Sequence, residues 1–284
     1  MGAGKIQMKI YFKIGLLAFS LFWQMAYAQD IVERANLFYK FIYKKHDFKF
    51  QLEDSFGVFT NESNKIFKPK GDGPFPAVVL IHTSGGLKNK HVKRDAQKLV
   101  ERGYVALVLD SMGPRGVNVI TESTRAMYPP TGVKDAYIAL DFLKTQNYVD
   151  KDRIYEAGYS WGGFVATLLG SPMLAKAAGA NDRFKASVSF YSTCVVNKSN
   201  LILADTDRPV LMLIAGDDKE NPHGTCFQDL EAYRSKGMPI ESFIYDKASH
   251  GWDKAGEAQL GYIYNEEITN DAFEKMINFF EKNK

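Results

Sequence analysis

The chain has 284 residues, which fits one large domain or two small ones. Its hydrophobic fraction of 45% and charged fraction of 24% are those of ordinary globular proteins. Its two cysteines exclude a disulfide-dense miniprotein and a four-cysteine zinc site. The formal net charge is +3, but the first 28 residues hold three lysines and no acid, so the remainder is neutral and its charge does not favour a nucleic-acid partner.

The N-terminal segment has the three parts of a secretory signal peptide. Three lysines precede an apolar run over residues 14–23, and small residues at positions 26 and 28 follow in the pattern that a signal peptidase reads. The run is too short to span a bilayer comfortably. We expect a leader over 1–28 and export of a single domain over 29–284 to the periplasm or the medium, without stable membrane insertion after cleavage. An uncleaved anchor and a mitochondrial-type presequence are the alternatives.

Strand-like runs alternate with helix-like segments along the rest of the chain. Residues 48–52 alternate apolar and polar, which predicts an edge strand, and the continuous apolar run over 77–81 is typical of a strand buried on both faces. Further strands are predicted over 105–109, 153–157, 186–190, 210–215 and 242–245. Helices are predicted over 92–100, 136–143, 162–170, 227–233 and 273–280, the last with Asn270 as its N-cap.

This alternation predicts an α/β fold with one mostly parallel sheet and helices on both of its faces. In such sheets ligands and catalytic groups gather at the carboxyl ends of the strands. The chemistry is therefore expected just after residues 81, 109, 157, 190, 215 and 245.

A serine flanked by glycines follows one of these strand ends. The segment is Gly158-Tyr159-Ser160-Trp161-Gly162-Gly163, between a predicted strand and a predicted helix. A nucleophilic serine on such a sharp turn needs small neighbours, and the helix that follows points amide N–H groups toward it. We predict that Ser160 is a nucleophile; the alternative is a glycine-containing turn with a solvated serine.

A serine hydroxyl needs a base to take its proton, and the base needs a carboxylate to orient it. In this type of fold the order along the chain is serine, acid, histidine. Only His223 and His250 follow the serine, and His250 comes after the last predicted strand, so we predict that it is the base. The alternative is a surface histidine in a loop.

The acid is expected in the loop after the strand over 210–215. Asp217 and Asp218 both stand there, and Asp218 is favoured because it lies farther into the loop and can turn toward His250. An aspartate that bonds its own turn is the alternative for either residue. Weaker candidates are Asp205, Asp207 and Glu220.

A tetrahedral intermediate also needs amide donors for its oxyanion. One is expected from Trp161, directly after the serine, and the other from Thr83 or Ser84 in the glycine-containing loop that follows the strand over 77–81. His82, at the start of that loop, is expected to be a structural residue beneath it rather than a base.

These motifs together resemble the dienelactone hydrolase-like branch of the α/β-hydrolases, especially its exported serine members. The resemblance covers residues 76–253 through the strand and loop at 76–86, the segment 110–116, the serine turn, the acid loop at 216–222 and the motif 249–253. It implies the α/β-hydrolase fold, and counting back from Pro222 it places the acid on Asp218. The founding enzymes carry a cysteine where Ser160 stands, so serine favours general ester chemistry. Arg115 is expected either to bind a substrate carboxylate or to pair with an acid of the protein.

The two cysteines, Cys194 and Cys226, follow consecutive strands, which are usually neighbours in a sheet. Export makes oxidation favourable, and exported relatives have similar cysteines, so we predict a disulfide. Two small buried hydrophobic residues are the alternative. No metal site is predicted, and no nucleotide-binding glycine loop is found, so no cofactor is implied.

The sequence as a whole predicts an exported serine hydrolase that cleaves a small-molecule carboxylic ester or lactone through an acyl-enzyme. A peptidase similar to the prolyl oligopeptidase catalytic domain is the second hypothesis, although too few residues precede the sheet to form that family's propeller. A binding protein that keeps the fold without catalysis is the third. The stretch over 111–130 is expected to border the substrate pocket as a cap, and the oligomeric state is not predicted.

Overall fold

The computed structural model describes most of the chain beyond the predicted leader. The described residues are 32–46, 48–53, 56, 64–88, 90–117, 129–196, 199–221, 226–256 and 261–284. The predicted leader, His223 and residues 118–128 of the predicted cap lie outside them.

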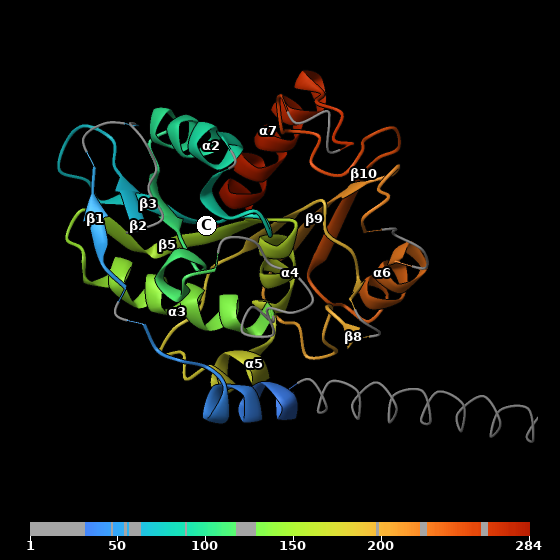
Figure 1. The fold of residues 1–284 in the computed structure, drawn as a ribbon, viewed down its shortest axis with the longest axis horizontal. Coiled ribbons are helices and arrows are strands. Elements are labelled where there is room, and N and C mark those ends of the chain that lie inside the picture. Colours follow the sequence, from blue (N-terminus) through green and yellow to red (C-terminus); the bar gives the residue numbers. More distant parts are fainter. Residues whose placement is uncertain are drawn as a thin grey trace, which may run out of the picture.

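Eight strands form one sheet in the order β1-β2-β4-β3-β5-β6-β9-β10 (Figure 1). Neighbouring strands run parallel except for β2 and β4, which are antiparallel. The strands are β1 (Phe50–Leu52), β2 (Asn64–Phe67), β3 (Phe75–Ile81), β4 (Val105–Leu109), β5 (Val149–Tyr159), β6 (Ser187–Phe190), β9 (Val210–Ala215) and β10 (Ile240–Tyr245). A small antiparallel pair, β7 (Val195–Val196) and β8 (Ser199–Asn200), follows β6. The predicted mostly parallel α/β sheet is confirmed.

Helices cover both faces of this sheet (Figure 1). On one face lie α2 (Lys90–Glu101) and α7 (Glu266–Lys282), and on the other lie α3 (Pro129–Thr145) and α4 (Trp161–Leu168). The remaining helical segments are a helix over residues 32–41, α5 (Pro172–Ala177), α6 (Cys226–Arg234) and the 3-10 turns η1 (Gly86–Lys88) and η2 (Gly113–Arg115). No helix of the described residues is long and apolar enough to cross a membrane.

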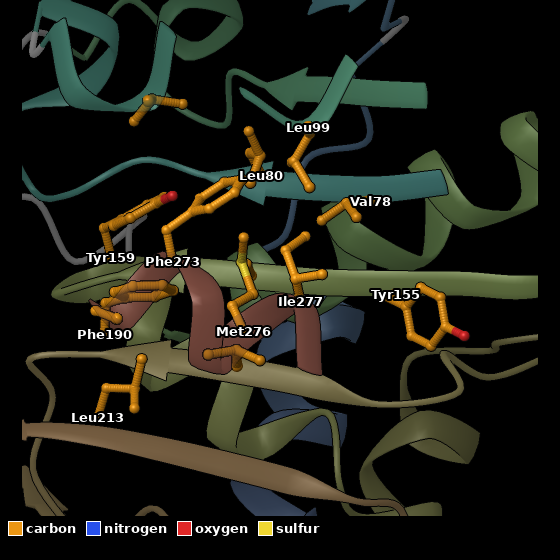
Figure 2. Close-up of a cluster of buried hydrophobic side chains, with 14 of the residues drawn as sticks. Val78, Leu80, Leu99, Tyr155, Tyr159, Phe190, Leu213, Phe273, Met276 and Ile277 are labelled. Carbon is orange, nitrogen blue, oxygen red and sulfur yellow. The ribbon is translucent and has the colours of Figure 1, made fainter. Parts of the chain in front are cut away.

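Strand β3 shows why a continuous apolar run is needed at the centre of the sheet. Val78 and Leu80 belong to the core beneath α2 and α7, whereas Val79 and Ile81 belong to the core on the opposite face. All four side chains are fully buried, because successive residues of a strand point to opposite faces and both faces are covered. Figure 2 shows the first of these cores, in which β3 meets Leu99 of α2 and Met276 and Ile277 of α7.

The structure differs from the sequence predictions at several elements: the helix over residues 32–41, β2, α5, β7 and β8 were not predicted, and α7 begins earlier than predicted. The four-residue strand β2 was not predicted, because so short a segment shows almost no period in its hydrophobic residues. The predicted cap of the last helix is wrong. The N-cap is Asn265, five residues before the predicted one, and Asn265 Oδ1 accepts the Ile268 N–H at 3.0 Å. Asn270 lies inside the helix, because the first turn is too polar for its helical period to appear in the sequence.

Candidate active site

Ser160 occupies the turn between β5 and α4, with φ 53° and ψ −107°. A positive φ is uncommon for a residue with a side chain, and such strain is found most often at functional sites. Close backbone contacts explain why glycines flank the serine. A Cβ atom at Gly158 would lie 2.0 Å from the Gly162 carbonyl oxygen, and a Cβ atom at Gly162 would lie 2.4 Å from the Ile81 carbonyl oxygen. The turn therefore excludes any larger residue at both positions.

His250 and Asp218 meet this serine at the carboxyl edge of the sheet. His250 Nε2 lies 2.9 Å from Ser160 Oγ, and His250 Nδ1 lies 2.7 Å from Asp218 Oδ2. The three residues are between 3% and 7% exposed, so these contacts are sheltered from water. Asp217 is exposed, and its backbone N–H donates to the Ala248 carbonyl at 3.0 Å. Of the two candidate acids, the structure brings only Asp218 to the histidine.

The local backbone orients the Asp218 carboxylate. Its Oδ1 accepts the N–H groups of Glu220 at 2.9 Å and Asn221 at 2.8 Å, which leaves Oδ2 facing the imidazole. A buried carboxylate is costly unless hydrogen bonds compensate for the lost water, and these two N–H groups do so. The acid loop therefore holds one carboxylate oxygen while it presents the other.

Further side chains lie around the imidazole, among them two tyrosines that the sequence analysis does not single out. The Tyr191 ring meets the His250 ring edge-on at 5.1 Å between centroids, and the Tyr262 ring lies 5.8 Å away. Glu220, a weaker candidate for the acid, has its Oε2 3.4 Å from His250 Nε2 and is half exposed. Because Glu220 faces the nitrogen that also meets the serine, it lies on the opposite side of the ring from Asp218. Neither tyrosine belongs to a motif that could have revealed it.

The loop after β3 lies against the start of α4. Besides approaching the Ile81 carbonyl, a Cβ atom at Gly162 would lie 2.8 Å from the His82 carbonyl oxygen. The loop turns back at once, since the Gly86 N–H donates to the Thr83 carbonyl at 3.0 Å and the Gly85 N–H donates to Thr83 Oγ1 at 3.2 Å. The backbone around Thr83 and the first residue of α4, Trp161, are thus brought to the same place.

His82 is a structural residue beneath this loop, as expected. It is fully buried, its Nδ1 lies 2.7 Å from the Thr83 carbonyl oxygen, and its Nε2 accepts the Ser111 N–H at 3.2 Å. The ring stacks on Trp161 with centroids 5.6 Å apart. Burial lowers the pKa of His82, so the neutral ring that these contacts require is favoured.

Arg115 pairs with an acid of the protein, one of the two expectations for it. Its Nη1 and Nη2 donate to the two carboxylate oxygens of Asp135 in α3, at 2.7 and 2.9 Å. The Arg115 side chain is only 6% exposed and that of Asp135 is fully buried. A fork-to-fork pair of this kind is among the strongest protein ion pairs. The guanidinium is therefore held by the fold rather than presented to a ligand.

The predicted disulfide between Cys194 and Cys226 is confirmed. Both residues are buried, and the bridge joins the segment after β6 to the start of α6, at a sequence separation of 32. Strands β6 and β9 are neighbours, which places the two cysteines at one end of the sheet. No group of three or more metal-ligating side chains is found among the described residues.

The sheet order and the strand-turn-helix at Ser160 define the α/β-hydrolase fold. The model of the dienelactone hydrolase family matches residues 64–283 of the chain. The chain therefore belongs to the dienelactone hydrolase family, as the motifs predicted, and is a hydrolase of the esterase kind.

The relatives found by sequence are distant. A provisionally assigned carboxymethylenebutenolidase of Escherichia coli strain K12 is 23% identical over 230 residues, which are 76% of this chain and 80% of that protein. Esterase EstD of Thermotoga maritima is 32% identical over 114 residues, which are 36% of this chain and 25% of that protein.

Solved structures show the same fold. A provisionally assigned dienelactone hydrolase of Klebsiella pneumoniae superposes with a TM-score of 0.60 at 22% identity, over 76% of this chain and 90% of that one. A thermophilic esterase of Thermogutta terrifontis, solved with propionate bound, superposes with a TM-score of 0.57 at 17% identity, over 77% of this chain and 88% of that one.

Proposed function

We propose that this hydrolase cleaves a small-molecule carboxylic ester or lactone through an acyl-enzyme formed on Ser160, with His250 as the base and Asp218 as the acid that orients it. The observation that carries the proposal is the unbroken chain of two short contacts, 2.9 Å from serine to imidazole and 2.7 Å from imidazole to carboxylate. Those distances are within the reach that proton transfer from a nucleophile to its base requires.

The chemistry then proceeds in two halves. His250 Nε2 takes the hydroxyl proton as Ser160 Oγ attacks the carbonyl carbon, and Asp218 stabilises the imidazolium that forms. The amides of Trp161 and of Thr83 or Ser84 donate to the oxyanion, and the imidazolium returns its proton to the leaving alcohol. Water then attacks the acyl carbon as the same imidazole takes its proton. The imidazolium returns that proton to Ser160 Oγ as the ester bond to the serine breaks, which releases the carboxylic acid and restores the free enzyme. None of these steps uses a metal or an organic cofactor.

Three observations support an ester as the substrate. The names of the relatives include an esterase and a carboxymethylenebutenolidase. A serine in place of the founding family's cysteine suits general ester chemistry. The pairing of Arg115 with Asp135 removes the one cation that had been expected to bind a substrate carboxylate, so we favour esters over the carboxylated dienelactones.

The same proposal includes export. The charge pattern of residues 1–28 supports a cleaved leader followed by one domain over 29–284, in the periplasm or the medium. The disulfide supports this compartment as well, because disulfides persist in oxidising surroundings and are rare in the cytosol.

The experiment that tests the proposed function is the replacement Ser160→Ala. We expect the purified chain to hydrolyse nitrophenyl esters and the variant to lose this turnover by at least about 1,000-fold, since the serine acts as one unit with its base. The variant Ser192→Ala is the matched control, because it removes a buried hydroxyl that hydrogen-bonds to Ser189 and not to a residue of the proposed triad. Retained turnover in Ser160→Ala would contradict the assignment.

The same purified chain can be used to test the two competing hypotheses, a peptidase and a non-catalytic binding protein. A panel of esters of increasing chain length, run beside peptide substrates, distinguishes an esterase from a peptidase. A fluorophosphonate probe labels either enzyme at the serine, so a folded chain that is not labelled would favour the binding protein.

A further inference from the structure

Helix α2 carries an adjacent pair of charged residues, Arg94 and Asp95, that the proposed mechanism does not use. Asp95 is 2% exposed, and the side chain of Arg94 is 28% exposed. Arg94 Nε donates to Asp95 Oδ1 at 2.8 Å. Burying charged groups costs free energy unless they are paired and hydrogen-bonded. The hydrogen-bond partners of Arg94 and Asp95 therefore identify the segments that this pair connects.

The first partner leads to the proposed nucleophile. Tyr159 is the last residue of β5 and directly precedes Ser160. Its hydroxyl donates to Asp95 Oδ2 at 2.7 Å, and the side chain is fully buried. The carboxylate of Asp95 therefore connects the end of the nucleophile strand to the guanidinium of Arg94.

The second partner leads to the proposed base. Arg94 Nη1 donates to the Asp253 carbonyl at 2.9 Å, and its Nη2 lies 3.6 Å from Asp253 Oδ2. Asp253 is three residues beyond His250, and its Oδ1 accepts the Tyr191 hydroxyl at 2.9 Å. The Tyr191 ring is the one that meets the imidazole edge-on. One guanidinium thus contacts the loop of His250 directly, and through Asp253 it reaches the ring that packs on the imidazole.

The protonation states favour this arrangement. Burial raises the pKa values of Tyr159 and Tyr191 well above the usual range, so both remain phenols that donate hydrogen bonds. Burial also raises the pKa of Asp253, and the Arg94 guanidinium, the Tyr191 hydroxyl and the Lys254 ammonium oppose that rise. Arg94 and Lys254 balance the charges of Asp95 and Asp253.

We propose that Arg94 is a positioning residue that sets the distance between His250 and Ser160, a proposal that rests on the proposed function. The nucleophile and the base come from segments far apart in the chain. The rings of Tyr159 and Tyr191 lie 6.2 Å apart between centroids, and Arg94 adds a charged link between the supports of both. The planar fork of arginine holds its N–H groups on separate nitrogens in fixed directions, whereas the lysine ammonium is a compact charge on a flexible stem and cannot span the same two acceptors in that geometry. A misplacement of about 1 Å between reacting groups can lower a rate about 100-fold.

The first test compares Arg94→Met, Arg94→Lys and the control Arg102→Met. Arg102 follows the same helix and pairs with Glu274 at the surface, both about half exposed. With active sites counted by fluorophosphonate titration, we expect Arg94→Met to lower kcat per site about 10- to 100-fold with KM within about 2-fold. Arg94→Lys should recover part of this loss, and Arg102→Met should match the wild type. A wild-type kcat per site in Arg94→Met would overturn the proposal.

A double-mutant cycle keeps the proposal testable if Arg94→Met fails to fold. Tyr159→Phe and Tyr191→Phe each remove one hydroxyl and keep the ring in the core. If both hydroxyls act through the same guanidinium, the double variant should lose less activity than the product of the two single losses. The proposal would be overturned if the loss of activity in the double variant equals the product of the two single losses, or if neither single variant loses activity.

A readout without turnover separates this proposal from the proposed function. The proton between His250 Nδ1 and Asp218 is expected to give a low-field NMR signal, since the two atoms lie 2.7 Å apart. Arg94→Met should shift or broaden that signal, and Arg102→Met should leave it unchanged. This result is independent of whether Ser160→Ala retains turnover, so the two proposals fail separately. A signal that is the same in Arg94→Met and in the wild type would also count against the network.

Discussion

Glu156 is a carboxylic acid enclosed directly beneath the turn that carries Ser160. It is fully buried, and neither of its oxygens has a hydrogen-bond partner among the described residues. Its Oε1 would lie 2.9 Å from a Cβ atom at Gly158, two residues before the serine. Burial raises the pKa of Glu156 well above its usual range, so the neutral acid is the form that the fold accepts.

The buried acid predicts a pH dependence of stability. The folded pKa of Glu156 exceeds its unfolded value near 4.3. Its stabilising contribution to the free energy of unfolding is therefore fully present below that value and is lost as the pH rises through the folded pKa. A neutral amide has no such loss, so Glu156→Gln should gain stability relative to the wild type as the pH rises from 5 to 8. Thermal unfolding at several pH values measures this.

The exposed variant Glu101→Gln is the matched control and should follow the wild-type profile. The absolute stability of Glu156→Gln is less informative, since the amide brings its own polar atoms into the core. A difference in Tm between Glu156→Gln and the wild type that stays constant with pH would show that Glu156 is already ionised in the folded chain.

At the scale of elements, Arg115 and Asp135 join three segments of the chain. The 3-10 turn η2 supplies the arginine, α3 supplies the aspartate, and the segment after the helix over 32–41 supplies Tyr43, whose hydroxyl donates to Asp135 Oδ1 at 2.9 Å. The guanidinium also lies over the rings of Tyr43 and Phe48, at 5.4 and 5.7 Å from their centroids. The pair therefore fastens the N-terminal segment beside the loop that follows β4.

Removing one charge of this pair should be costly. Asp135→Asn leaves a buried guanidinium without its counter-charge, and we expect a loss of about 3–5 kcal/mol in the free energy of unfolding. The matched variant Glu274→Gln breaks the exposed pair with Arg102 and should cost at most about 1 kcal/mol. Urea unfolding of the two variants checks the contrast, and equal losses would show that burial of the first pair does not matter.

At the scale of the whole molecule, the disulfide ties the β6 end of the sheet to the helix that follows the acid loop. Its 32-residue separation corresponds to roughly 3–4 kcal/mol in the chain-entropy model. Cys194→Ser with Cys226→Ser should lower Tm, and should lower turnover less than Ser160→Ala does, because neither cysteine touches the proposed triad. A Tm that does not change on removal of both cysteines would contradict this role.

Export has a separate measurement at the same scale. Expression of the full chain in a bacterial host should yield a mature N-terminus at Gln29, read by mass spectrometry, in the periplasmic fraction or the medium. The mature chain should contain no free thiol. Recovery of the uncleaved chain in the cytosol, with both cysteines reduced, would contradict the proposed leader and compartment.

Much of the fold and of the candidate site could be predicted from the sequence, because their signals are local. Strands β3, β4 and β9 are continuous apolar runs, since both faces of each strand are covered. The serine turn is visible because its backbone contacts allow only glycine at positions 158 and 162. Ser160 and His250 follow predicted strand ends, and the rule that chemistry gathers there selected them.

The tertiary structure decided what depends on distance between remote segments. Asp217 and Asp218 are the same residue type in one loop, and although the sequence favours the second, only the path of the acid loop brings its carboxylate to the imidazole. Arg115 could have met a substrate or a protein acid, and the position of α3 settled this in favour of Asp135. The contacts of Arg94 with Asp253, 159 residues away, have no sequence signal, because hydrogen bonds between remote side chains impose no period and no motif. The sequence by itself thus determined which residue types stand at the strand ends. The packing of helices and loops on the sheet decided which of these residues come within hydrogen-bond distance of one another.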